Sequence, residues 1–123
     1  MYKMDHVGVR IKDTNVSTQF YCNILGCQVV GKLENEIREI IFLKSGDGVI
    51  ELINKFNDNE NRSAGQVDHI AFTVDNLDDA IKRLHEFNVK LLGDTPIQVT
   101  ENMRVIFFEG PDGERLEFVE KKN

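Results

Sequence analysis

The sequence predicts an α+β protein built from two tandem βαβββ modules, and three observations support this fold. The chain has 123 residues, which suits one compact domain or two very small modules that share a core. Several segments of the first half recur in the same order in the second half. Each copy has the pattern of a strand and a helix followed by three strands.

The repeat is visible in two pairs of segments. Residues 5–11 (DHVGVRI) resemble residues 68–74 (DHIAFTV), 63 positions later. Residues 40–48 (IIFLKSGDG) resemble residues 105–113 (VIFFEGPDG), 65 positions later. Loop insertions readily account for so small a change in spacing. We therefore expect one domain over residues 1–123, with a first module over residues 1–54, a linker over 55–66 and a second module over 67–123.

The first module is expected to begin with a strand over residues 4–12, where apolar and polar residues alternate. A helix follows, with Asn15 as its N-cap and Gly26 at its end. Its apolar stripe is formed by Val16, Phe20 and Ile24. Three more strands are predicted over residues 28–34, 37–44 and 48–54.

The second module repeats this order. A strand is predicted over residues 67–74, and Asn76 is expected to cap the next helix. Three strands are predicted over residues 89–93, 103–109 and 115–121. The packed face of the helix is expected to consist of Leu77, Ala80, Ile81, Leu84 and Phe87.

Composition and charge exclude several kinds of partner. The net charge is −6, and an acidic chain repels phosphate backbones and anionic lipids, so we expect neither nucleic acid nor a membrane as a partner. The apolar runs are far shorter than the roughly 20 residues that span a bilayer. The start of the chain has no apolar signal core, which predicts a cytoplasmic protein. Cys22 and Cys27 are too few for a disulfide framework.

Strand alternation predicts which polar side chains share a face. In the first strand Asp5, Val7, Val9 and Ile11 share the face that packs on the helix, and His6 lies on the other face. Alternation in the last strands likewise places Glu51 and Glu117 away from the helices. A single strand histidine is usually an ordinary polar residue on a solvated face. The same two residue types, however, recur at equivalent positions in both modules, which favours a site.

Pairing of the modules about a pseudo-twofold axis would bring four side chains together. Two imidazoles and two carboxylates suit one divalent ion per site, Ni²⁺, Zn²⁺ or Co²⁺, with positions left for water or substrate. Without a cation, two neighbouring carboxylates would repel each other. The predicted metal ligands are His6, Glu51, His69 and Glu117.

At these residues the sequence resembles the glyoxalase/bleomycin resistance group, the vicinal oxygen chelate superfamily. The segments that carry the resemblance cover nearly the whole chain: residues 5–10, 20–26, 49–52, 67–72 and 110–118. The resemblance implies the paired βαβββ fold of that group, which often forms homodimers. The order His, Glu, His, Glu is most similar to glyoxalase I, the lactoylglutathione lyases, where the four matching positions bind the metal and Arg10 matches a residue that grips the glutathione carboxylate.

The resemblance implies a carbon–sulfur lyase that acts in methylglyoxal detoxification. Its substrate would be the hemithioacetal of a 2-oxoaldehyde with glutathione or another thiol, and its product a 2-hydroxyacyl thioester formed through an enediolate. Glu117 is expected to be the principal base, and pseudo-symmetry makes Glu51 the alternative.

Other members of the superfamily leave alternatives open. Proteins similar to methylmalonyl-CoA epimerase share the fold and a similar site, but usually carry Gln where Glu51 stands. Dioxygenase relatives use two His and one Glu with iron, generally on longer chains. Resistance proteins of the bleomycin-binding kind hold a small molecule without a metal.

Overall fold

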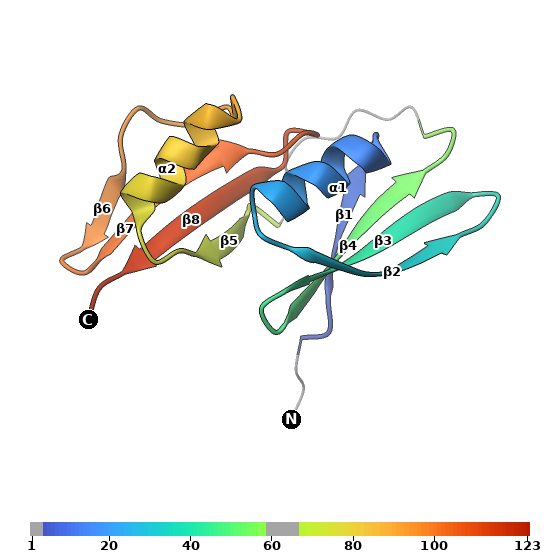
Figure 1. Cartoon of the computed structure of the whole chain (residues 1–123), viewed down its shortest axis with the longest axis horizontal. Helices are drawn as coiled ribbons and strands as arrows, with labels where there is room; N and C mark the ends of the chain where they lie inside the picture. Colours follow the sequence, from blue (N-terminus) through green and yellow to red (C-terminus); the bar gives the residue numbers. More distant parts are fainter. Residues whose placement is uncertain (1–3, 59–66) are drawn as a thin grey trace. The chain divides into compact units, whose positions relative to one another are not determined.

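Each half of the chain folds into a four-stranded sheet with one helix across it (Figure 1). The structure is a computed structural model that describes residues 4–58 and 67–123. The chain divides into two compact units, a first unit of residues 1–61 and a second unit of residues 62–123.

In the first unit the strand order is β1-β4-β3-β2. Strands β1 and β4 are parallel, and the other neighbours are antiparallel. The last strand along the chain, β4, therefore lies inside the sheet, between the first strand and its own hairpin partner. The elements of this unit are β1 (Val7–Ile11), α1 (Thr14–Asn23), β2 (Gln28–Glu34), β3 (Arg38–Ser45) and β4 (Gly48–Lys55).

The second unit has the same topology, with the strand order β5-β8-β7-β6. Strands β5 and β8 are parallel, as β1 and β4 are. The α+β fold of two tandem βαβββ modules is thus confirmed. The elements are β5 (Ile70–Thr73), α2 (Leu77–Glu86), β6 (Ile97–Thr100), β7 (Met103–Glu109) and β8 (Arg115–Lys121).

One face of each sheet forms the core of its unit. Helix α1 packs on β3 and β4, and α2 packs on β7 and β8. Tyr21 of α1 and Leu84 of α2 are fully buried. The strand residues that alternate toward the helices are also buried, as the sequence predicts, and in the two central strands they are Ile50, Leu52, Leu116 and Phe118. The residues between them are free to form a polar face.

Helix α1 begins earlier than its sequence predicts. Its N-cap is Asp13, whose backbone is extended and whose Oδ1 accepts a hydrogen bond from the Val16 amide over 3.0 Å. The prediction of Asn15 as the N-cap is therefore wrong, because Asp13 reaches the free amide first. Val16 itself is exposed, and Ser17 and Tyr21 are the buried residues of this helix.

The end of α1 and the start of α2 are as the sequence predicts. Gly26 has a φ of 71°, a left-handed conformation that glycine adopts without strain at a helix end. Asn76 caps α2, and its Oδ1 accepts a hydrogen bond from the Asp79 amide over 3.0 Å. Leu77 and Leu84 are buried as predicted, whereas Phe87 is exposed just beyond the helix.

The strand predicted over residues 89–93 is not formed as a regular strand. In this segment only Leu91 makes a bridge, to Phe108. The strand that pairs with β7 at this edge is β6, which starts immediately after Pro96. Gly93 has a φ of 157°, and Pro96 has no amide hydrogen for a strand ladder. These two residues separate the Leu91 bridge from β6.

Lys55, the first residue of the linker predicted over residues 55–66, is still part of β4. Residues 59–66 of that linker lie outside the described residues, so its extent stays a prediction. Within residues 4–58 and 67–123, neither helix has the length and apolar character needed to cross a bilayer.

Candidate metal centre

The first unit brings His6 and Glu51 together. His6 immediately precedes β1, and Glu51 lies in the middle of β4. The two strands are parallel neighbours, and the residue facing Glu51 is Gly8, two positions after His6. Residues two apart lie on the same face of a strand. His6 therefore reaches Glu51 diagonally, and its Nε2 lies 2.9 Å from Glu51 Oε2.

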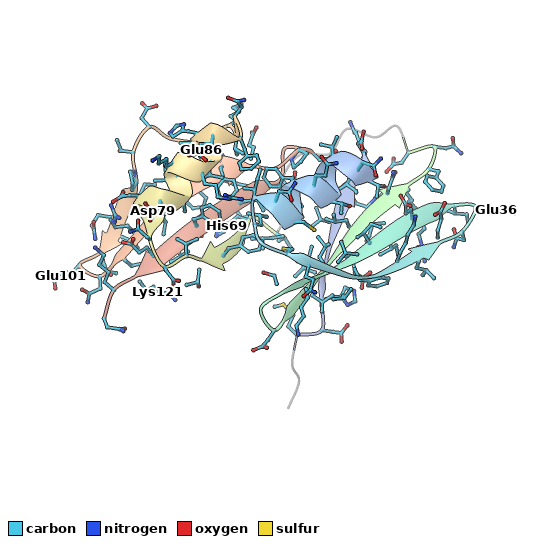
Figure 2. The ribbon with its side chains drawn as sticks, viewed as in Figure 1. Glu36, His69, Asp79, Glu86, Glu101 and Lys121 are labelled. Carbon is cyan, nitrogen blue, oxygen red and sulfur yellow. The ribbon has the colours of Figure 1, made fainter. Side chains whose placement is uncertain are left out.

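The second unit repeats this contact with His69 and Glu117. The residue facing Glu117 across the β5–β8 pair is Ala71, two positions after His69. His69 Nε2 lies 3.0 Å from Glu117 Oε1, and Figure 2 labels His69 beside β5. Each predicted His–Glu pair is thus formed within its own unit, on the sheet face opposite the helix.

The two members of each pair differ in exposure. The side chains of Glu51 and Glu117 are 15% and 12% exposed, because both come from strands inside a sheet. The side chains of His6 and His69 are 43% and 34% exposed. Each pair thus combines a mostly buried carboxylate on an interior strand with a partly exposed imidazole.

A second carboxylate contacts each imidazole on its other nitrogen. Asp5 Oδ2 lies 2.7 Å from His6 Nδ1, and Asp68 Oδ2 lies 2.8 Å from His69 Nδ1. Strand alternation predicts that Asp5 faces the helix, and this prediction is wrong, because β1 begins only at Val7 and Asp5 precedes its regular pleat. The repeated Asp-His dipeptide was the sequence signal for this contact.

The two contacts of each ring favour a cation at Nε2. A neutral imidazole carries one ring hydrogen, so one of its two contacts sets a nitrogen lone pair against a carboxylate oxygen. A second proton or a metal ion between Nε2 and the glutamate removes that repulsion. The hydrogen bond to Asp5, together with the charge of Glu51, raises the pKa of His6. The hydrogen bond from His69 and the charge of Arg115 lower the pKa of Asp68.

Aromatic residues form part of the same face. Phe42 is opposite Glu51 in the β3–β4 register, and Phe107 is opposite Glu117 in the β7–β8 register. The Phe107 ring meets the His69 ring edge-on, with 5.3 Å between their centroids. These rings give each His–Glu pair an apolar neighbour, as the wall of a small-molecule site requires.

Arg10 occupies the same face of β1 as His6 and lies opposite Ile53 of β4. Its guanidinium forms an ion pair with Asp58, just after β4, and both side chains are partly buried. The predicted substrate-binding arginine is therefore held in place by a carboxylate. Such a guanidinium can exchange one carboxylate for another, since the two form similar charge-assisted hydrogen bonds.

The two His–Glu contacts do not by themselves bring all four predicted ligands to one point. Over residues 4–58 and 67–123, no three or more His, Cys, Asp and Glu side chains are grouped closely enough to hold a metal ion. Each unit supplies one imidazole and one carboxylate at the ligand positions, so four-ligand binding stays a prediction that needs both pairs.

The sequence profile of the Glyoxalase/Bleomycin resistance protein/Dioxygenase superfamily matches residues 3–118. Among curated proteins, the chain is 31% identical to the uncharacterized protein YwbC of Bacillus subtilis, covering 97% of this chain and 98% of the relative. It is 27% identical to the lactoylglutathione lyase of Salmonella typhimurium, covering 96% and 92% of the two chains.

Solved structures give the same fold. The trypanothione-dependent glyoxalase I of Leishmania major superposes with a TM-score of 0.84 over 98% of this chain and 87% of that one, at 21% identity. At this identity the likeness concerns the fold. Together with the profile match, it identifies the paired βαβββ architecture as that of the superfamily.

Proposed function

Because the chain belongs to the Glyoxalase/Bleomycin resistance protein/Dioxygenase superfamily, we propose that it is a metal-dependent lyase of the glyoxalase I kind. The observation that carries this proposal is the duplicated His–Glu pair, at 2.9 Å in the first unit and 3.0 Å in the second. The similarity to a lactoylglutathione lyase over nearly the whole chain supports it.

The proposed ligands of one divalent ion, Ni²⁺, Zn²⁺ or Co²⁺, are the two pairs taken together, whichever copy of the chain supplies each pair. Two imidazoles and two carboxylates neutralise the ion and leave positions for two substrate oxygens. The bound ion would act as a Lewis acid that polarises two adjacent oxygens and stabilises an enediolate. The ligands are His6, Glu51, His69 and Glu117.

Glu117 is the proposed general base. It would remove the proton from the hemithioacetal carbon, which bears the hydroxyl and the sulfur, and return it to the neighbouring carbonyl carbon. With the hydroxyl proton passed to the former carbonyl oxygen, the product is a 2-hydroxyacyl thioester. Glu117 lies on the interior strand β8, which limits its movement. Its contact with His69 Nε2 keeps the carboxylate on the sheet face opposite the helix. Glu51 occupies the equivalent position in the first unit, and is the second candidate for this role.

Arg10 is the proposed anchor for a substrate carboxylate. In a fully extended strand, four residues separate it from His6 by roughly 13 Å, a distance that suits the far end of a tripeptide-sized thiol such as glutathione. The substrate carboxylate would take the place of Asp58 beside the guanidinium. The working form is proposed to be a homodimer in the cytoplasm that removes methylglyoxal.

The test combines metal analysis with one assay. Metal-free protein is loaded with Ni²⁺ or Zn²⁺ and mixed with methylglyoxal and glutathione, and thioester formation is followed by absorbance. Bacillithiol and coenzyme A are tested in parallel as other thiols. Metal-dependent thioester formation with any of them supports the proposal. Metal binding without thioester formation favours another metal enzyme of the superfamily, and absence of metal binding favours a metal-free small-molecule carrier.

A further inference from the structure

We propose that Asp5 and Asp68 are positioning residues that hold His6 and His69 with Nε2 available to the metal. This inference deepens the proposed function and depends on it for the identity of the ligand. Each of these aspartates directly precedes one of the two histidines in the sequence, and neither belongs to the predicted ligand set.

The geometry of the contact is the same in both units. The Nδ1–Oδ2 distance is 2.7 Å for His6 and Asp5 and 2.8 Å for His69 and Asp68. An ionised carboxylate can only accept a hydrogen bond. When a metal ion takes the lone pair of Nε2, the one hydrogen of the neutral ring must therefore lie on Nδ1, where the aspartate accepts it. In the metal-bound state the contact thus holds both the tautomer and the direction of the ring.

Exposure argues that these carboxylates have a role other than folding. The Asp5 side chain is 93% exposed and the Asp68 side chain 62% exposed, so neither fills the core. An isolated surface contact adds little to stability. The same contact formed in both units, each time on the nitrogen opposite the proposed metal ligand atom, matches the carboxylate–histidine–metal arrangement that orients ligating histidines in proteins.

The second unit supports its aspartate further. Arg115 Nη1 lies 3.4 Å from Asp68 Oδ2, and the Arg115 guanidinium lies over the Phe107 ring at 5.0 Å. Phe107 in turn contacts His69 edge-on. Four side chains thus form a closed ring of contacts that keeps His69 in one orientation. The residue equivalent to Arg115 in the first unit is Val49, which supplies no such charge.

The experiment compares two substitutions at each aspartate. Asp5→Asn and Asp68→Asn remove the charge but keep an oxygen that can accept from Nδ1, whereas Asp5→Ala and Asp68→Ala remove both. Zn²⁺ affinity is measured by competition with a chelator in the full chain. Each Ala variant is expected to bind Zn²⁺ about 10–100-fold more weakly than the wild type. Each Asn variant is expected to show a smaller loss of Zn²⁺ affinity. The control for a change in net charge is Asp94→Asn, at an exposed residue between Leu91 and β6.

A spectroscopic signature separates positioning from a purely structural role. In the Zn²⁺-loaded wild type, long-range ¹H–¹⁵N spectra should show hydrogen on Nδ1 of both histidines, and the Ala variants should lose this signal to exchange. Wild-type affinity and an unchanged Nδ1 signal in the Ala variants would overturn the inference and leave the proposed function standing. A wild type that binds neither Zn²⁺ nor Ni²⁺ would overturn the proposed function, and this inference with it.

Discussion

Gly8 and Glu51 face each other across the parallel pair of β1 and β4, and the missing side chain of Gly8 leaves the diagonal path from His6 to Glu51 open. The equivalent residue in the second unit is Ala71, opposite Glu117. A small residue at this position is therefore common to both units. It explains how an imidazole two residues away can approach the carboxylate to hydrogen-bonding distance.

The first prediction concerns the size of residue 8. A Cβ at Gly8 would lie 3.1 Å from Ile53 Cδ1, the flexible tip of a side chain, so Gly8→Ala should be tolerated with a small shift of Ile53. Gly8→Leu would place a branched side chain opposite Glu51, and we expect at least about tenfold weaker Zn²⁺ binding, the lower end of the range seen when a ligand's surroundings are disturbed. Equal Zn²⁺ affinity of the two variants, measured by chelator competition, would contradict this explanation.

The second prediction tests the general base. Glu117→Gln keeps the size of the side chain but removes its basicity, and the turnover number should fall about 10²–10⁴-fold, the usual contribution of general acid–base catalysis. The circular dichroism spectrum should stay unchanged, because Glu117 lies on the face opposite the helix. Glu51→Gln is the matched variant in the other unit. Full activity of Glu117→Gln in the thioester assay would refute the assignment of the base.

The third prediction separates two possible helix caps. Asp13→Ala removes the side-chain acceptor for the Val16 amide, and should lower the free energy of unfolding by about 0.5–2 kcal/mol. Asn15→Ala, one residue into α1, should change it by less than about 0.5 kcal/mol. Urea denaturation of both variants provides the measurement. A larger loss of stability in Asn15→Ala than in Asp13→Ala would identify Asn15 as the cap and contradict a helix start at Thr14.

The fourth prediction concerns acid stability through Glu120. This buried carboxylate accepts a hydrogen bond from the Leu77 amide at the start of α2 over 2.7 Å and forms an ion pair with Arg104. The Leu77 amide, followed by Arg104, lowers the pKa of Glu120. Because the pKa of Glu120 is lower in the folded state than in the unfolded state, its ionised form stabilises the fold at neutral pH. This stabilisation decreases as the pH falls below about 4.3, the ordinary pKa of glutamate, and is lost once the pH is below the folded-state pKa.

Glu120→Gln should therefore be less stable than the wild type at pH 7, and the difference should shrink as the pH is lowered toward 3. The measurement is the urea midpoint at each pH, with Glu86→Gln, an exposed residue at the end of α2 that Figure 2 labels, as the control. A difference between wild type and Glu120→Gln that is the same at pH 7 and pH 3 would show that the charge of Glu120 makes no contribution.

Much of the fold could be predicted from the sequence because equivalent segments occur in both modules, so each predicted element has a second copy that supports it. Alternation in the central strands correctly separated Glu51 from the buried Leu52, and Asn76 was the correct cap. Strand 89–93 could not be predicted correctly, because its residues have strand-like character and only the break around Gly93 and Pro96 moves regular pairing to β6. Local sequence does not show which of two apolar segments, residues 89–93 or 97–100, will pair with β7 at the edge of the sheet.

The candidate site was predictable only in part. Strand parity placed each histidine on the same face as its glutamate, and each contact is present in its unit. Strand alternation does not predict the aspartate contacts, because Asp5 and Asp68 precede the regular strands β1 and β5. The Asp58 partner of Arg10 and the contact between Phe107 and His69 depend on side-chain packing between separate elements, which strand periodicity does not describe.

The most direct test of the central claim is the number of Zn²⁺ or Ni²⁺ ions that the metal-free protein binds, measured by isothermal titration and native mass spectrometry. Four-ligand binding predicts one tightly bound ion per chain, and His6→Ala and His69→Ala should each weaken the binding of that same ion. Two ions per chain, with each variant removing only one of them, would contradict the claim, and so would a wild-type protein that binds none.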